Sequence, residues 1–230
     1  MIAFEHIFLR YWGPNEEYAL QDINLEIGSG EMIFFLGPSG AGKTSLLRLV
    51  TLEEMPAQGR VRVLEFDSSR IKGREIPRLR RKVGVVYQDF RLLREKTIFE
   101  NIAYVLRMTG VLDTSTLQRI VLRLLTQVSL YHKRNHFPDQ LSGGEQQRAA
   151  IARALVHEPR IVLADEPTGN LDAASANEIL DLFRRVNMAG ATVVVATHDE
   201  SLAARYATRT VFLEGGRVVR EARPVRARAL

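Results

Sequence analysis

The sequence predicts an α/β domain: a mainly parallel β-sheet covered by helices, an antiparallel β part at the N-terminus, and a helical subdomain inserted into the core. Two observations predict this fold. The first is a set of short, continuous, often β-branched apolar runs, which are typical of parallel strands buried on both faces. They occupy residues 33–36, 83–86, 161–163 and 192–195. The second is a change to helical spacing over residues 88–141, which indicates the insertion.

The elements at the two ends follow from local spacing. Apolar residues alternate over residues 2–11 and again over residues 20–27, which predicts two antiparallel strands that each have one solvated face. A Gly-Ser-Gly turn at residues 28–30 closes the second strand. Gly215-Gly216 lies between apolar residues and predicts a terminal hairpin.

The inserted segment is expected to hold at least two helices. Thr97-x-x-Glu100 forms a capping box, in which each residue satisfies a backbone N–H group at the start of a helix. Residues 117–128 repeat apolar side chains at helical spacing and predict a second helix.

Composition narrows the classes of function. The chain of 230 residues has no cysteine, which excludes disulfides, thiolate metal sites and cysteine nucleophiles. No apolar run approaches the ~20 residues that a membrane-spanning helix needs. The first residues lack the basic and apolar regions of a secretory signal. We therefore expect a cytoplasmic protein that reaches a membrane only through a partner.

The net charge of +5 is concentrated in two basic clusters. One holds Arg78, Arg80, Arg81 and Lys82, and the other holds Arg217, Arg220, Arg223, Arg226 and Arg228. Such clusters can be ordinary solvated surface. They can also attract an anionic membrane surface, at ~1 kcal/mol for each basic residue near such lipids. A positive net charge is also found in proteins that bind nucleic acid.

A phosphate-binding loop follows the predicted strand 33–36. The nucleotide-binding residues expected here are Gly37, Pro38, Ser39, Gly40, Ala41, Gly42, Lys43, Thr44 and Ser45. Glycines let the backbone curl until successive N–H groups point at phosphate oxygens, and the next helix adds the positive end of its dipole. Lys43 is expected to reach the β- and γ-phosphates, and the Thr44 hydroxyl to ligate Mg²⁺.

Two acidic residues follow the predicted strand 161–163. Asp165, at the carboxyl end of a strand, can hold Mg²⁺ directly or through water. Glu166 can then accept a proton from the water that attacks the γ-phosphate. Adjacent acids can also be plain loop carboxylates, but the phosphate loop upstream favours the catalytic role.

Leu141-Ser142-Gly143-Gly144-Glu145 resembles the signature of ATP-binding-cassette (ABC) ATPases, and the resemblance runs over residues 1–216. It implies one domain, 1–230, with the P-loop NTPase core of an ABC nucleotide-binding domain in residues 1–88 and 159–216. The helical subdomain would be residues 89–158, and residues 217–230 would form a basic C-terminal tail. The resemblance also implies Mg²⁺-dependent ATP hydrolysis and a homodimer that closes around two ATP molecules.

Further site residues come from the resemblance alone. Gln88 matches the glutamine that senses Mg²⁺ and the attacking water, and His198 matches the histidine that contacts the γ-phosphate. Tyr11 matches the aromatic residue that stacks on adenine, with Trp12 as the competing candidate. The residues implied to contact ATP held by the opposing subunit are Ser142, Gly143, Gly144, Glu145 and Asp172. The pair Ser142-x-x-Glu145 also has the form of an ordinary capping box.

Residues 74–81, 88–93 and 169–172 resemble the branch of this family that contains bacterial cell-division ATPases. That branch implies an integral membrane partner resembling FtsX, a peripheral position on the cytoplasmic face of the inner membrane, and control of cell-wall hydrolysis. One alternative is the energy-coupling subunit of a lipoprotein-release or efflux transporter. The other is a nucleic-acid-associated ATPase. Lys43 and Ser142 lie too close in sequence for the long coiled coil or zinc module of such proteins, so no nucleic acid is expected.

The segment 89–104 is expected to dock a cytoplasmic helix of the membrane partner. Phe90, Leu92, Leu93 and Phe99 are more apolar than catalysis requires. The alternative is that these four side chains pack the core of the subdomain.

Overall fold

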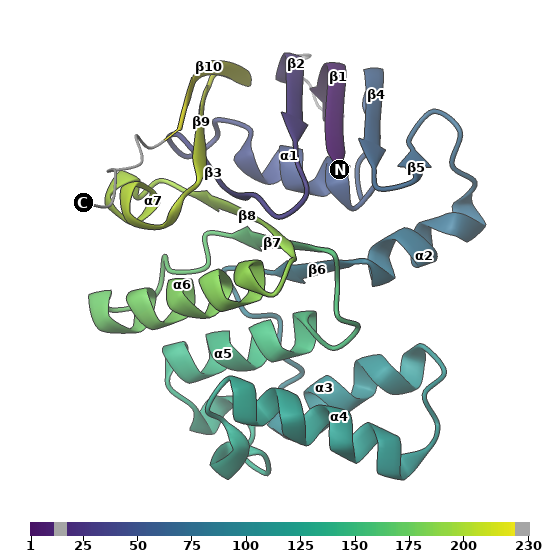
Figure 1. The fold of residues 1–230 in the computed structure, drawn as a ribbon, viewed down its shortest axis with the longest axis vertical. Coiled ribbons are helices and arrows are strands. Elements are labelled where there is room, and N and C mark those ends of the chain that lie inside the picture. Colours follow the sequence, from purple (N-terminus) through teal and green to yellow (C-terminus); the bar gives the residue numbers. More distant parts are fainter. Residues whose placement is uncertain (12–17, 224–230) are drawn as a thin grey trace.

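The computed structural model describes residues 1–11 and 18–223, so Trp12 lies outside the described residues. Figure 1 shows two sheets within them. The antiparallel sheet has the order β2-β1-β4-β5, formed by β1 (Ile2–Arg10), β2 (Tyr18–Ile27), β4 (Gln58–Val63) and β5 (Phe66–Asp67). The larger sheet has the order β10-β9-β3-β8-β7-β6, formed by β3 (Met32–Leu36), β6 (Val83–Val86), β7 (Ile161–Asp165), β8 (Thr192–Thr197), β9 (Arg209–Glu214) and β10 (Arg217–Ala222).

Seven α-helices lie within the described residues. They are α1 (Lys43–Val50), α2 (Ile76–Arg81), α3 (Ile98–Met108), α4 (Thr114–Gln127), α5 (Gly143–Ala154), α6 (Ala173–Met188) and α7 (Glu200–Tyr206). Short 3₁₀ turns occupy Gly73–Glu75, Tyr131–Lys133 and Pro138–Gln140.

The central strands β3, β7 and β8 of the larger sheet are buried on both faces, which explains why their sequences are continuously apolar. Strands β9, β3, β8, β7 and β6 run parallel, and β10 pairs antiparallel with β9. In β3, Phe34 packs into a core with α5 and α6, whereas Ile33 and Phe35 pack into a second core with α1 and the antiparallel sheet. Helix α1 therefore lies between the two sheets (Figure 1). The predicted parallel sheet is confirmed.

The pairing of β1 with β2 shifts register at three bulges, which explains why the apolar residues of the antiparallel sheet do not alternate regularly, and two of the bulges fall at residues with positive φ. The pairing of β1 with β2 shifts between Phe4 and Ile7, where His6 has a φ of 48°. The shift between Ile7 and Leu9 falls opposite Asp22, with a φ of 50°. Each bulge inserts one residue, so the apolar side chains on both sides of it face the same core.

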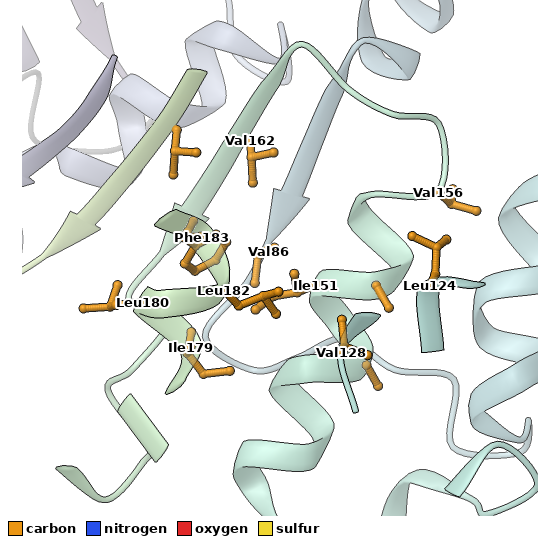
Figure 2. Packing of buried hydrophobic residues seen from close by; sticks show 14 of the residues in the cluster. Val86, Leu124, Val128, Ile151, Val156, Val162, Ile179, Leu180, Leu182 and Phe183 are labelled. Carbon is orange, nitrogen blue, oxygen red and sulfur yellow. The ribbon is translucent and has the colours of Figure 1, made fainter. Parts of the chain in front are cut away.

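The helical subdomain lies at the far end of the larger sheet (Figure 1). Thr97 caps α3 and makes the expected box with Glu100. Helix α4 begins before residue 117, at Thr114, because Asp113 caps it through the N–H of Thr116. Figure 2 shows side chains of α4, α5 and α6 gathering against the sheet, among them Ile151.

The chain beyond Gly216 does not begin as a tail. Residues 217–222 form β10, because Gly215 and Gly216 both have positive φ, at 53° and 75°, and turn the chain back along β9. The expected hairpin is thus present, and the boundary of 217 for the tail was wrong. Residues 224–230 lie outside the described part of the chain.

Candidate active site

The loop between β3 and α1 has the curled backbone that phosphate binding requires. Gly37 has a φ of 146°, and a Cβ there would lie 2.1 Å from the carbonyl oxygen of Leu213. Gly42, the N-cap of α1, has a φ of 101°, and its Cβ would lie 2.6 Å from Leu20 Cδ2. Both positions therefore demand glycine, and the loop opens onto the N-terminus of a helix, which favours an anion.

Lys43 lies over this loop with its ammonium group directed at the loop backbone. Its Nζ donates to the carbonyl oxygens of Gly37 at 2.7 Å and Pro38 at 3.1 Å, and lies 3.5 Å from Glu166 Oε1. The residue is only 6% exposed. A buried cation held by the loop carbonyl oxygens at the N-terminus of a helix is suited to a polyphosphate.

Asp165 and Thr44 form an oxygen pair beside the loop. The Thr44 hydroxyl donates to Asp165 Oδ1 at 3.0 Å. Burial raises the pKa of Asp165 above its usual 3.8, and the charge of Glu166 raises it further. A hydroxyl and a carboxylate suit Mg²⁺, which prefers oxygen ligands and takes few of them from the protein when phosphates are present. The described residues contain no cluster of three or more histidine or acidic side chains that could hold a metal by themselves.

Glu166 is held in an unusual backbone conformation. Its φ is 45°, in the left-handed region that non-glycine residues rarely adopt, and its N–H donates to the Ala196 carbonyl at 2.8 Å. The carboxylate lies 3.1 Å from His198 Nδ1 through one oxygen and 3.5 Å from Lys43 through the other. One carboxylate thus joins the loop lysine to the histidine that follows β8.

Gln88 and Tyr11 approach the same region from other elements. Gln88 follows β6, and its amide Nε2 lies beside Gly169, where an added Cβ would be 3.2 Å away. Its carbonyl accepts from Asn170 Nδ2 at 3.4 Å. Tyr11 follows β1, is 38% exposed, and its hydroxyl lies 3.0 Å from Ser45 Oγ on the first turn of α1.

The Ser-Gly-Gly-Glu segment lies apart from this cluster. Ser142 is the N-cap of α5, and it and Glu145 make a reciprocal capping box at 3.3 and 2.9 Å. Asp172 caps α6 through the N–H of Ser175. No hydrogen bond in the described part of the chain joins residues 142–145 to residues 37–45. The structure therefore gathers the phosphate loop, Asp165, Glu166 and His198 in one cluster, whereas residues 142–145 and Asp172 lie at the N-termini of α5 and α6, with Ser142 exposed and Gly144 buried.

Two polar residues of α5, neither of them predicted from the sequence, contact the loops that carry Glu166 and Gln88. Gln147 Nε2 donates to the Pro167 carbonyl at 2.9 Å. Arg153 donates to the carbonyl oxygens of Phe90, at 2.8 Å, and Arg91. Gln147 lies one helical turn from Ile151, on the apolar face of α5, and a polar side chain in such a position was the available signal.

A groove of about 370 Å³ lies next to Arg153, between β6, α2, α3 and α5. The side chains that line it include Arg81, Tyr87, Leu93, Tyr104, Arg153 and His157. Leu93 and Tyr104 are 40% and 41% exposed.

A phosphate loop after β3, an Asp-Glu pair after β7 and a histidine after β8 define a P-loop nucleotide hydrolase. A family model described as "ABC transporter" matches residues 20–169. The chain belongs to the ABC transporter family, and it is an ATPase of that family.

Curated relatives cover nearly the whole chain. A protein of Mycobacterium tuberculosis named "Cell division ATP-binding protein FtsE" is 46% identical over 96% of this chain and 95% of its own length. Proteins of the same name from Bacillus subtilis and Escherichia coli are 43% and 44% identical, over 96% and 94% of this chain and 96% of their own lengths. The predicted resemblance to the cell-division branch is confirmed.

Solved structures match the whole fold. A dimeric bacterial ABC transporter cassette has a TM-score of 0.89 and 37% identity, over 97% of this chain and 98% of its own. A dimeric cassette in a post-hydrolysis state, bound to ADP and phosphate, has a TM-score of 0.88 and 35% identity, over the same shares of the two chains. The predicted ABC nucleotide-binding fold and ATP binding are confirmed. Among the described residues, no helix is both long and apolar enough to span a bilayer.

Proposed function

We propose that this chain is the ATPase subunit of a bacterial cell-division complex, in which it drives a conformational change in an integral membrane partner resembling FtsX. The change controls cell-wall hydrolysis on the other side of the membrane. The chain acts from the cytoplasmic face of the inner membrane. The observation that carries the proposal is the contact of one carboxylate, Glu166, with both Lys43 and His198, in a chain whose relatives are named for cell division.

The catalytic roles follow from the positions of these groups. Glu166 accepts the proton of the attacking water, and His198 contacts the γ-phosphate from the same side. Thr44, Asp165 and Gln88 hold Mg²⁺, which supplies charge neutralisation of the phosphates when it is bound. Tyr11, whose hydroxyl lies beside Ser45 on the first turn of α1, stacks on adenine.

Two copies close around two ATP molecules. The N-terminus of α5 presents Ser142 and Gly143, at the positive end of an α-helix of 12 residues, away from the phosphate loop of its own chain. Such a terminus binds an anion, and the γ-phosphate of the opposing subunit supplies one. Gly144, Glu145 and Asp172 lie along the same seam. The dimeric state of the similar solved cassettes supports this arrangement.

The groove between α2, α3 and α5 receives the cytoplasmic helix of the membrane partner. This groove uses only part of the docking face expected from the sequence. Leu92 and Phe99 pack against the core of the subdomain and Phe90 faces Gly143, so these three side chains do not line the groove. Leu93 and Tyr104 line it and are both exposed.

The proposal is tested by purifying the membrane-bound complex and identifying the integral protein in it. A membrane protein of the FtsX type supports the proposal, and a transporter permease contradicts it in favour of lipoprotein release or efflux. A variant with Leu93→Ser and Tyr104→Ser should lose this partner and keep its own ATPase rate. Leu112→Ser, 81% exposed and outside the groove, is the matched control that should keep both. Equal retention of the partner by both variants places the docking site elsewhere.

A further inference from the structure

Helix α5 carries a fully buried amide at a point where an apolar side chain would be expected. Gln147 is 0% exposed, and it lies on the helix face that also presents Ala150 and Ile151 to the core. Its Nε2 donates to the carbonyl oxygen of Pro167 at 2.9 Å. Its Oε1 has no hydrogen-bond partner within the part of the chain that the structure describes. Burying a polar atom in this way costs stability, so the amide is not explained by packing.

The atom that Gln147 holds belongs to the residue after Glu166. The left-handed φ of Glu166, 45°, needs support on both sides, because the surrounding structure must over-determine a strained residue for it to persist. The Glu166 N–H bonds to the Ala196 carbonyl on β8, and the Glu166 carbonyl accepts from the Gly169 N–H at 3.2 Å. The bond from Gln147 to Pro167 is the contact that comes from a helix of the other subdomain.

Helix α5 touches this loop along its first two turns. A Cβ on Gly143 would lie 3.4 Å from Leu171, and one on Gly144 would lie 3.2 Å from Ser175 Oγ. Arg148 adds an ion pair to Glu178 of α6 at 2.8 Å. Helix α5 therefore contacts residues of the segment 167–175 directly, and Gln147 makes its hydrogen bond nearest to Glu166.

We propose that Gln147 is a positioning residue that couples the signature helix to the catalytic carboxylate of its own subunit. It fixes the backbone that aims Glu166 at the attacking water. The inference rests on the proposed base role of Glu166 and on the proposed ATP-bridged dimer. The N-terminus of α5 binds the ATP of the opposing subunit. Through Gln147, the position of the Glu166 carboxylate in one active site therefore depends on the nucleotide bound in the other active site.

The test replaces Gln147 with methionine, which has similar volume and flexibility and makes no such hydrogen bond. Methionine removes the unpartnered Oε1 as well as the bond to Pro167, so the thermal midpoint should stay close to that of the wild type. The expected kcat falls by about 10- to 100-fold, since a small misplacement of a catalytic group costs that much. The affinity for a fluorescent ATP analogue should not change. Gln147→Leu is the second variant if the methionine protein does not fold.

A double-variant comparison separates positioning from a general structural role. Adding Gln147→Met to Glu166→Gln should lower the residual hydrolysis rate no further, because the group that Gln147 positions is already gone. The same fold-loss in both backgrounds, or a wild-type kcat in Gln147→Met, overturns the proposal. Normal hydrolysis by Glu166→Gln alone overturns instead the base role on which it rests. Gln146→Met is the matched control, since the side chain of Gln146 donates to the carbonyl oxygen of Leu141, at 3.1 Å, and not to residues 166–175, and it should keep the wild-type kcat.

Discussion

Replacing Lys43 with alanine should weaken ATP binding strongly while leaving the protein folded. The lysine is 6% exposed and its Nζ already makes two hydrogen bonds to the loop, at 2.7 and 3.1 Å. The ammonium group therefore needs no reorganisation to meet a phosphate. A hydrogen bond to a charged group contributes about 1.5–3 kcal/mol. At 1.4 kcal/mol for each factor of ten, the dissociation constant should rise about 10- to 140-fold.

Titration with a fluorescent ATP analogue measures this change, and circular dichroism checks that the variant is folded. Lys82→Ala is the matched control, because Lys82 pairs with Glu65 on the surface and its loss lowers the net charge equally. Its affinity for the analogue should equal that of the wild type. A folded Lys43→Ala protein that binds with wild-type affinity refutes the assignment of the phosphate site. An equal loss in both variants would show that net charge, and not the position of Lys43, attracts the nucleotide.

Three further predictions concern the base, the metal and a helix cap. Glu166→Gln should keep ATP and accumulate as dimers, because an amide cannot accept the proton of the water; a protein that sediments as a monomer with ATP and Mg²⁺ contradicts this. Because the pKa of Asp165 is raised, its carboxylate is protonated at a higher pH than an ordinary aspartate. The affinity for Mg²⁺, measured by calorimetry with ATP, should therefore begin to fall at that higher pH as the pH is lowered. Without metal, the free energy of unfolding depends on pH in the opposite direction. The neutral carboxyl of Asp165 stabilises the folded state at low pH, and this contribution is lost as pH rises from 3.8 through the raised pKa. Thr97→Ala should lower the free energy of unfolding by about 1 kcal/mol, since Thr97 Oγ1 accepts the Glu100 N–H at 3.2 Å; an unchanged urea midpoint would refute the cap.

The parts that sequence predicted depend on near neighbours in the chain. The apolar run at residues 33–36 predicts a buried strand because its side chains on both faces are apolar. The spacing of glycines around Lys43 predicts a phosphate loop, and the capping box at Thr97 predicts a helix start, because each pattern lies within a few residues. Sequence placed the tail at residue 217 because the arginines of β10 carry no strand alternation, although the turn before them does predict the hairpin.

The sequence by itself determined the fold class and the family, because each is carried by a short pattern or by overall likeness, and it predicted the candidate site residues in the same way. Only the tertiary structure decided how these residues act on one another. The left-handed backbone of Glu166 and its contacts with Lys43 and His198 depend on the order in which β3, β7 and β8 pair. The bond from Gln147 to Pro167 joins residues 20 positions apart, on a helix and a loop whose meeting no local pattern records. Contacts of this kind arise from the packing of distant segments, so they become visible only when the chain is folded.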